Sequence, residues 1–445
     1  MKKPTFVDLV YPILIFCAGI FALPYILYMS IRRKKYRHGW KQKLFGAVPE
    51  LSPTEGDRKR LWLHGVSVGE VNLLKPIVRE LEKRRPDWEY VVSATSETGY
   101  ELAKKLFGDR APVFYCPLDF KPVVDRAVRR LKPDLLVLVE LELWPGLVRA
   151  ANDAGVRVAI VNGRISDKSF KRYRLVKRAL APTFRRIDLV AAQDEIAAGY
   201  FKALSPCPEL VSVVGSVKFD GVQTNRANSA TERLAKLAGI ESDDVVFLAG
   251  STQDPEESGA LETYRRLYRD FPKLKLILVP RHRERFEEVA RLLDESEFTW
   301  TRRSTLQEGA RPQPPKDAAP NADPRRILLV DAIGELGAWW GTAAIAFVGG
   351  SWGNRGGQNM LEPAGYGAAV SFGPNTRNFR VVSEALLNAK GAVVVANVDE
   401  MEAFVRKCLL EPEYCRSLGA AAQALTLRNA GASERTVAAL EALLS

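Results

Sequence analysis

A repeated alternation of short apolar runs with helical stretches, which begins at Arg60, most constrains how this chain can fold. A buried strand followed by a helix is the repeating unit of a parallel sheet that helices cover on both faces. We therefore predict two doubly wound, Rossmann-like α/β domains. The predicted strands are 61–63, 90–95, 113–116, 135–139, 156–161, 189–192 and 211–214 in the first, and 245–249, 275–279, 327–330, 345–348, 369–372 and 392–395 in the second.

A polar stretch over residues 221–243 separates the two series of strands. It predicts three parts: an anchor and basic segment (1–43), a first domain (44–225), and a second domain (226–445) that includes the C-terminal helices. A stretch rich in Pro, Ala and charge, residues 302–325, predicts a mobile surface loop. Doubly wound sheets bind ligands at the carboxyl ends of their strands, so we expect the two sets of strand ends to face a central cleft.

Residues 9–31 contain no charged side chain, and 23 such residues are enough to cross a hydrocarbon core of roughly 30 Å. Arg32, Arg33, Lys34 and Lys35 follow directly, where a cleaved signal peptide would need small residues. By the positive-inside rule this cluster predicts a membrane anchor with the rest of the chain on the cytoplasmic side. Pro12 and Pro24 keep a monotopic anchor open as the alternative to a spanning one.

The distribution of charge favours lipid over nucleic acid as a partner. Residues 1–43 carry a net charge of +8, out of +12 for the whole chain, and this excess lies beside the apolar segment. Anionic headgroups attract basic residues in that position, and no basic platform interleaved with aromatic side chains occurs elsewhere in the sequence. We therefore predict membrane lipids as a partner and exclude a nucleic-acid-binding function.

Cysteine and histidine are sparse and scattered. There is no CxxC pair and no HExxH spacing, so neither a disulfide framework nor a metal site is predicted. The cysteines are Cys17, Cys116, Cys207, Cys408 and Cys415, and the histidines are His38, His64 and His282.

The first predicted strand ends in HGVSVGE, residues 64–70, and runs into a helix. Its glycines permit a tight turn, and a helix start offers free N–H groups, so Ser67 and Gly69 are candidate substrate-binding residues. Glu70 lies on the first helical turn and is our candidate general base. The field of the helix should lower its pKa and keep it ionised at neutral pH. The alternative is a carboxylate that only complements the helix dipole.

Two further strands of the first domain end in charged residues. Glu140 and Glu142 follow an apolar strand in the segment ELELWP, and strand alternation points both to the same side. Lys218 follows another strand in GSVKFD. Carboxylates that leave a buried strand are usually paired or functional, so a structural ion pair remains the alternative to catalysis. For Lys218 the alternative is a solvated side chain.

The second domain carries several segments that suit a nucleotide. Gly250–Thr252 suggests an anion cradle, Arg281 after Pro280 could grip a phosphate, and Gly334 in the strand-to-helix segment 331–336 could approach a base. His282 fits a local structural role better than catalysis. Glycine pairs at 349–350 and 356–357 bracket a loop that leads to a helix start. Backbone N–H groups near Gly357 could bind phosphate, and Glu362 could accept hydrogen bonds from both ribose hydroxyls. An ordinary surface loop is the alternative.

These motifs, in this order, resemble the Kdo transferases, which move 3-deoxy-D-manno-octulosonic acid (Kdo) from CMP-Kdo onto the lipid A precursor of the inner membrane. The resemblance covers nearly the whole chain. It rests on HGVSVGE, ELELWP, GSVKFD, VPRH, IGEL, GGQNMLEP and FGPNTRNF (residues 372–379). It implies the GT-B fold, with the acceptor on the first domain and the nucleotide on the second, and inverting transfer without a cofactor or bound metal.

The resemblance also implies residue roles. Glu70 would be the base that deprotonates the acceptor, and Glu140 and Lys218 would stabilise the transition state. Matching the CMP-binding segments are Pro280, Arg281, Ile333, Gly334, Glu335, Asn359, Met360, Leu361 and Glu362. Gln253 and Gln358 differ from the pattern, since the family usually has histidine there. A transferase or epimerase for another nucleotide sugar, or an inactive membrane-bound binding protein, remains the alternative function.

Overall fold

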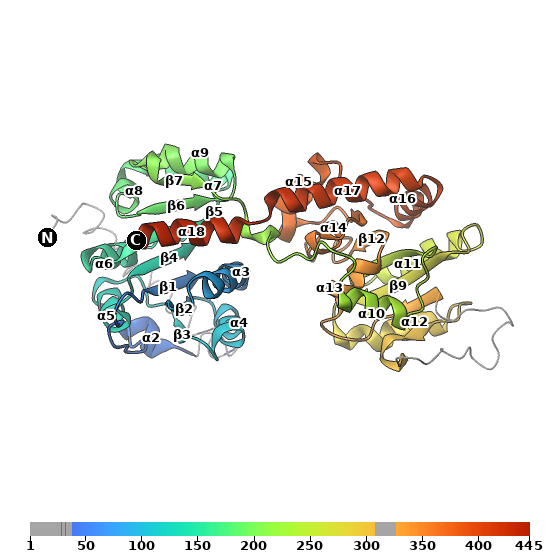
Figure 1. The fold of residues 1–445 in the computed structure, drawn as a ribbon, viewed down its shortest axis with the longest axis horizontal. Coiled ribbons are helices and arrows are strands. Elements are labelled where there is room, and N and C mark those ends of the chain that lie inside the picture. Colours follow the sequence, from blue (N-terminus) through green and yellow to red (C-terminus); the bar gives the residue numbers. More distant parts are fainter. Residues whose placement is uncertain (1–27, 29–31, 33–37, 308–325) are drawn as a thin grey trace. The chain divides into compact units, whose positions relative to one another are not determined.

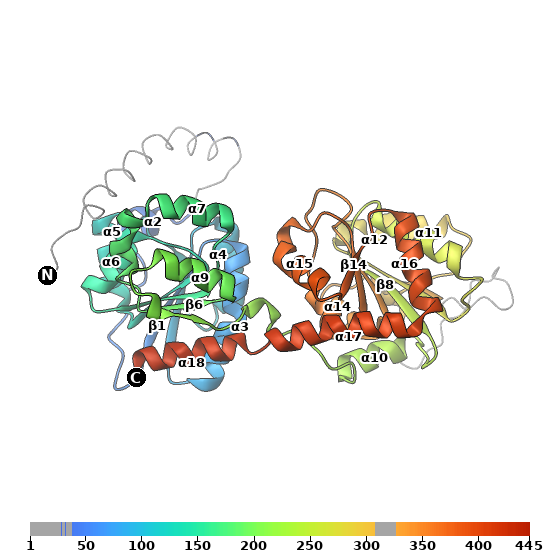
Figure 2. The same cartoon turned by 90° about the horizontal axis from the view of Figure 1, so that it is seen from above.

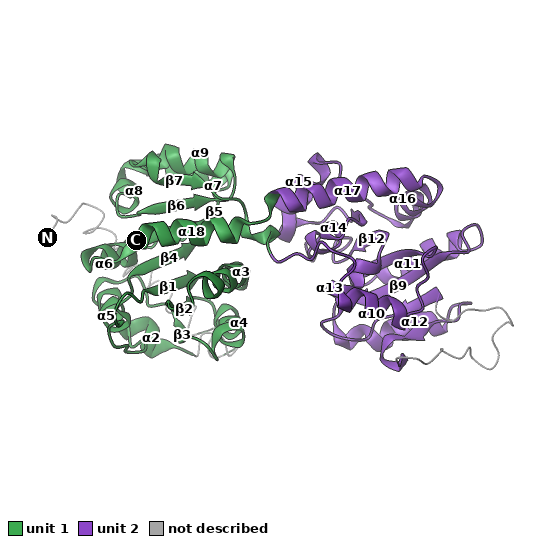
Figure 3. Ribbon diagram, viewed as in Figure 1, with its two compact units in different colours: residues 1–220, 429–445 green, residues 221–428 purple. Residues whose placement is uncertain are grey.

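The computed structural model describes residues 28, 32, 38–307 and 326–445, which form two compact units (Figure 3). One unit contains the residues up to 220 together with 429–445, and the other contains 221–428. The predicted anchor at 9–31 and most of the predicted loop at 302–325 lie outside the described residues. No helix within the described part of the chain is long and apolar enough to span a membrane.

The first unit has a sheet of seven parallel strands in the order β3-β2-β1-β4-β5-β6-β7, which confirms all seven predicted strands. The strands are β1 (Arg60–Gly65), β2 (Glu89–Ala94), β3 (Val113–Tyr115), β4 (Leu135–Val139), β5 (Arg157–Gly163), β6 (Leu189–Ala192) and β7 (Val211–Val213). The helices are α2 (Trp40–Phe45), α3 (Val68–Arg84), α4 (Glu97–Phe107), α5 (Lys121–Leu131), α6 (Pro145–Asp153), α7 (Asp167–Leu175), α8 (Lys177–Phe184), α9 (Glu195–Leu204) and α18 (Ala432–Leu444) (Figure 1).

Strand β1 shows how the sheet buries both faces. All six of its residues are buried. Leu61 and Leu63 point into the core that contains the apolar side of α3, while Trp62 points into the core on the opposite face with Phe114. This alternation has the period of two that a strand imposes, and apolar side chains on both faces are what a helix-covered parallel sheet requires.

The second unit repeats the architecture with the strand order β10-β11-β9-β8-β12-β13-β14, again all parallel. The six predicted strands are confirmed, and the two-residue β10 at the edge was not predicted; its second residue, Arg302, is the first residue of the predicted loop. The strands are β8 (Val245–Thr252), β9 (Leu274–Pro280), β10 (Thr301–Arg302), β11 (Ile327–Leu329), β12 (Ile345–Val348), β13 (Ala369–Phe372) and β14 (Ala392–Val394). The helices are α10 (Ser229–Leu237), α11 (Glu256–Leu267), α12 (Phe286–Asp294), α13 (Leu336–Trp339), α14 (Leu361–Gly365), α15 (Arg380–Asn388), α16 (Val398–Leu410) and α17 (Pro412–Asn429).

The last helix, α18, belongs to the first unit, although we assigned all of 226–445 to the second domain. Figures 1 and 2 show it among the elements of the first unit. Asp220 fixes its start, because its carboxylate accepts hydrogen bonds from the backbone N–H groups of Gly431 (2.7 Å) and Ser433. Arg84 of α3 binds Glu441 at 2.6 Å, and Val437 and Leu440 are fully buried in the first core. The division also falls at residue 220 rather than at 225.

We expect Leu440→Ala to destabilise the first unit by ~2–5 kcal/mol, because it removes a fully buried side chain and leaves a cavity. Hydrogen exchange measured by mass spectrometry should be faster than in the unmutated protein in β1 and α3, and unchanged in β8 and β12. Leu427→Ala on α17, where the side chain is 53% exposed, is the matched control and should change stability by less than ~0.5 kcal/mol. An increase in exchange of the same size in both units would contradict the assignment of α18 to the first unit.

Candidate active site

The topology of each sheet marks where a ligand should bind. Strand order reverses between β1 and β4 in the first sheet, and between β8 and β12 in the second. Ligands of doubly wound sheets bind outside the carboxyl ends of the strands at such switch points. In the first unit these ends lead to Glu70 and Glu140, and in the second they lead to Gln253 and Gly349.

Glu70 is the third residue of α3, and its carboxylate bends back over the turn from β1. Its Oε2 accepts a hydrogen bond from the backbone N–H of Val66 at 2.6 Å, and its Oε1 accepts one from Ser67 Oγ at 3.0 Å. A side chain at Gly65 would crowd this turn, since a Cβ there would lie 3.2 Å from the Cβ of Glu70. The two hydrogen bonds therefore orient the carboxylate over the turn, while the neighbouring Gly69 is exposed.

The pKa of Glu70 is raised, which corrects our expectation that the helix field lowers it. Burial is the largest cause, because it disfavours the charged form. The hydrogen bonds from Val66 and Ser67 oppose this effect, and the negative charge of Glu140 adds to it. A carboxylate with a raised pKa binds a proton more tightly, so this environment makes Glu70 a stronger base.

Glu140 and Lys218 form an ion pair, with 3.7 Å between Glu140 Oε1 and Lys218 Nζ. Their side chains are 28% and 30% exposed, so both are open to a ligand. The pairing follows from two local turns. Glu140 leaves β4 with a left-handed φ of 58°, and Lys218 lies in a 3-10 turn whose Val217 N–H is bound by Asn162. Because the backbone turns at Glu140, strand alternation does not relate it to Glu142, but the charge of Glu140 still raises the pKa values of both Glu70 and Glu142.

Glu142 was not among our predicted site residues, yet the pKa of its carboxyl group is strongly raised. Burial, followed by the negative charge of Glu70, raises its pKa to about 7. The negative charge of Glu142 also contributes to the raised pKa values of Tyr173 and Cys116. The only sequence signal was its place in ELELWP.

The buried side chain of His64 has a structural role instead. Its Nδ1 lies 2.9 Å from Ser93 Oγ and burial lowers its pKa to about 4, so it is a neutral structural residue at physiological pH.

The titration of Glu142 gives a prediction about stability. Its folded-state pKa of about 7 lies above the ordinary value of 4.5, so the folded protein binds more protons between these values. The stability that this proton contributes is complete below pH 4.5 and is lost as pH rises through 7. We therefore expect the Tm of Glu142→Gln, relative to the unmutated protein, to rise between pH 5 and pH 8. A Tm difference that stays constant over this range would contradict the assignment.

In the second unit, three predicted donor-binding residues come together. Arg281 follows β9 and is exposed, and its backbone N–H donates to Thr252 O at 3.0 Å. Asn359 Nδ2 donates to Glu362 Oε1 at 3.1 Å. Burial raises the pKa of Glu362, while the Asn359 hydrogen bond and the positive charge of Arg281 oppose this rise. A cation, an amide and a carboxylate therefore lie close together at this end of the sheet.

The segment 333–335 also fits a ligand surface, with one carboxylate already engaged. Ile333 is 75% exposed, and Gly334 has a φ of 92° with open space beside its Cα. Glu335 instead binds Arg303 through two hydrogen bonds of 2.7 and 2.8 Å. This ion pair supports the turn, and the exposed face of the turn is left to Ile333 and Gly334.

Other predicted contacts are not available in the form we expected. The side chains of Pro280, Met360 and Leu361 are buried, so only their backbone could meet a ligand. The N–H of Gly357 donates to the carbonyl of Gly350 at 2.7 Å, because the left-handed glycines at 356 and 357 close the loop on itself. That N–H therefore does not face a phosphate.

The predicted anion cradle at 250–252 is the end of strand β8 rather than a turn, and the next helix begins only at Glu256. The residues that differ from the family pattern lie nearby and close together. The Nε2 atoms of Gln253 and Gln358 lie 3.5 and 3.2 Å from the point where Gly350 would carry a Cβ. The two neutral carboxamide groups thus lie together next to Gly350.

Comparison with known proteins decides the family. Residues 38–221 match the family model described as 3-deoxy-D-manno-octulosonic-acid transferase (kdotransferase). The 3-deoxy-D-manno-octulosonic acid transferase of Haemophilus influenzae is 32% identical over 428 residues, and the match covers 95% of each chain. The chain belongs to the Kdo transferase family. It is therefore a glycosyltransferase, as predicted, and the enzyme of the same name from Chlamydia muridarum is 30% identical over 431 residues, 95% of this chain and 94% of that one.

Solved structures confirm the predicted GT-B fold of this Kdo transferase. The crystal structure of UDP-GlcNAc 2-epimerase from Neisseria meningitidis, bound to UDP-GlcNAc, matches 86% of this chain and 99% of its own with a TM-score of 0.52. The sequences are only 12% identical, so the match concerns the fold alone. In the described part of this Kdo transferase, no three His, Cys, Asp or Glu side chains are arranged to hold a metal ion.

Proposed function

We propose that this enzyme transfers Kdo from CMP-Kdo to a hydroxyl group of the lipid A precursor, lipid IVA, with inversion at the anomeric carbon. The observation that carries the proposal is the carboxylate of Glu70, which is held by Val66 and Ser67 in a half-buried turn at the switch point of the first sheet. Its orientation and its raised pKa are what a general base for a hydroxyl group requires.

In this scheme Glu70 removes the proton from the acceptor hydroxyl as its oxygen forms a bond to the anomeric carbon of Kdo. The bond from that carbon to the phosphate oxygen breaks, and CMP leaves with the electron pair. Positive charge develops on the sugar and negative charge on the phosphate. The Glu140–Lys218 pair offers both signs of charge to such a transition state, and preorganised charges of this kind often dominate catalysis.

The second unit would bind the nucleotide. Arg281 is an exposed cation for the phosphate, and Glu362, held by Asn359, can accept hydrogen bonds from ribose hydroxyls. The exposed turn at Ile333 and Gly334 offers a surface for the cytosine ring. The scheme uses no cofactor and no metal ion. We further propose that the apolar segment 9–31 and the basic residues after it attach the enzyme to the cytoplasmic face of the inner membrane.

The test is to incubate the purified full-length protein with lipid IVA and either CMP-Kdo or UDP-GlcNAc. We expect CMP release only when CMP-Kdo and the lipid are both present, and mass spectrometry of the lipid gives the number of Kdo residues added. Reaction with UDP-GlcNAc alone would support the alternative of a transferase or epimerase for another nucleotide sugar. Binding of CMP-Kdo without turnover would support an inactive binding protein.

A further inference from the structure

The loop between β12 and α14, residues 349–360, carries the proposed nucleotide contacts but has no regular structure of its own. Gly350, Gly356 and Gly357 adopt left-handed φ values of 67°, 93° and 80°. Glycine residues give the backbone of this loop great conformational freedom, and that freedom is lost when the loop takes up one conformation. The loop therefore needs bonds from outside to hold Asn359 in a binding conformation.

Glu256 supplies these bonds on the N–H side of the loop. It is the first residue of α11 and is 1% exposed. Its carboxylate accepts hydrogen bonds from the backbone N–H groups of Gly350 (2.7 Å), Ser351 (2.8 Å) and Trp352 (2.9 Å). A fourth bond, from the N–H of Gln253 at 2.9 Å, ties the same carboxylate to the end of β8. Hydrogen bonds to a buried charge are among the stronger ones in proteins.

The FGPNTRNF motif supplies the bonds on the carbonyl side, which gives this motif a role that sequence reasoning did not assign. Its side chains donate to three successive parts of the loop backbone. Asn375 Nδ2 binds Trp352 O at 3.2 Å, Arg377 Nη2 binds Asn354 O at 2.6 Å, and Asn378 Nδ2 binds Arg355 O at 2.8 Å. The backbone N–H of Asn378 also binds Gly356 O at 2.9 Å.

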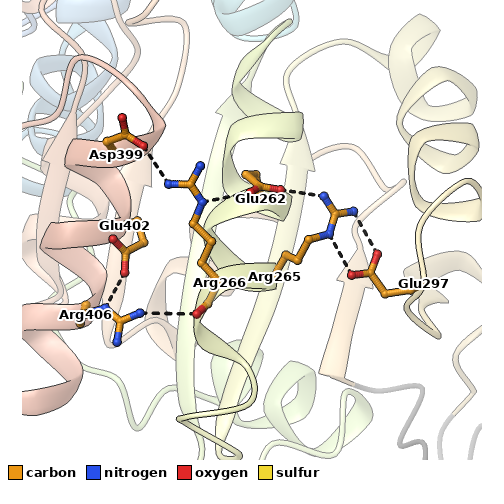
Figure 4. A network of polar contacts seen from close by, with 7 residues as sticks. All are labelled: Glu262, Arg265, Arg266, Glu297, Asp399, Glu402 and Arg406. Carbon is orange, nitrogen blue, oxygen red and sulfur yellow. Dashed lines mark hydrogen bonds and ion pairs between the residues drawn. The ribbon is translucent and has the colours of Figure 1, made fainter.

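The helix that carries Glu256 is itself fixed at its outer surface. Figure 4 shows Glu262 between Arg265 and Arg266, with Arg265 reaching Glu297 and Arg266 reaching Asp399 of α16. Single exposed ion pairs stabilise little, but a connected network restrains a helix better than isolated pairs do. The helix that carries Glu256 is thus held by α16 and Glu297, through contacts that do not involve the loop.

We propose that Glu256 and Asn378 are positioning residues that hold the glycine loop from its two sides, so that Asn359 and Glu362 are set for the nucleotide before it binds. Neither residue acts on the donor directly. The inference rests on the proposed function for the identity of the nucleotide. Preordering a loop lowers the entropy cost of binding, so loss of either side chain weakens nucleotide binding.

Glu256→Gln tests the N–H side. The amide keeps the size of the side chain but replaces one acceptor oxygen with an NH₂ group that faces N–H donors. Glu257→Gln is the matched control, because Glu257 is the next residue and equally buried at 1%, but binds Arg285 at 2.5 Å instead of the loop. Calorimetry of the full-length protein with CMP should show a Kd at least tenfold higher for Glu256→Gln and less than twofold changed for Glu257→Gln.

Asn378→Ala tests the carbonyl side, with Asn354→Ala on the loop itself as control, since only the backbone of Asn354 is bonded to the motif. We expect KM for CMP-Kdo to rise with kcat changed less in Asn378→Ala, and Glu256→Asp to recover part of the affinity lost in Glu256→Gln. CMP affinities in Glu256→Gln and Asn378→Ala that equal those of their controls would overturn the proposal. If the unmutated protein binds UDP and not CMP, the proposed function fails, and Glu256→Gln and Asn378→Ala with their two controls decide the positioning role with UDP.

Discussion

Glu70→Gln is expected to lower the rate of Kdo transfer by about 10² to 10⁴-fold, the usual contribution of a general base. Gln can still accept a hydrogen bond from the Val66 N–H, so the turn should keep its shape. It cannot take up the proton of the acceptor hydroxyl. The affinity for CMP should stay within twofold, because the proposed nucleotide residues lie on the other unit. Steady-state transfer assays and CMP calorimetry measure the two effects separately.

Glu80→Gln is the control for this variant. Glu80 lies on the same helix and pairs with Lys83, on a part of α3 away from the turn. Its variant should transfer Kdo at nearly the normal rate. Normal turnover in Glu70→Gln would remove Glu70 as the base, and Glu142 would then be the next carboxylate to test.

Lys218→Met should lower transfer by about 10² to 10³-fold, in line with the loss of one preorganised charge at a developing transition state. Met fills a similar volume but leaves Glu140 without its partner 3.7 Å away. Lys218→Arg keeps the positive charge, although the shape of its head group differs, and should recover part of the rate. The loss should appear mainly in kcat, since we assign the pair to the transition state.

The pair can be tested as a unit with Glu140→Gln and the double variant Glu140→Gln, Lys218→Met. Two residues that act through one interaction give non-additive losses, so the double variant should be little worse than Lys218→Met alone. Additive losses would mean that Glu140 and Lys218 act independently. The Tm of Lys218→Met is measured as well. If it falls so far that unfolding at the assay temperature accounts for the whole loss of rate, the pair is purely structural.

The strands could be predicted well because each one leaves a local signal. Runs such as 135–139 are apolar at every position, as burial on both faces requires, and β4 covers the same five residues. The place of Glu70 followed from the same logic, since a strand end, glycines and a helix start lie within seven residues of sequence. Local patterns of this kind need no knowledge of the tertiary structure.

Features that depend on distant parts of the chain could not be predicted in this way. The pKa of Glu70 is raised chiefly by burial, which depends on parts of the chain that the local sequence does not identify, and the hydrogen bonds from Val66 and Ser67 do not outweigh this effect. Glu256 lies 94 positions before Gly350, and nothing in the sequence indicates that its carboxylate would occupy the N–H groups of that loop. The assignment of α18 failed for the same reason, because its amphipathic pattern does not say which core it covers.

The return of the C-terminus to the first unit has a consequence for synthesis on the ribosome. Residues 221–428 must all be made before α18 can dock and Asp220 can cap it. At about 5 to 20 residues per second, translation of these 208 residues takes roughly 10 to 40 s. During that interval the site of Val437 and Leu440 on the first unit is uncovered, so the unit that emerges first from the ribosome cannot complete its core until the whole second unit has been synthesised.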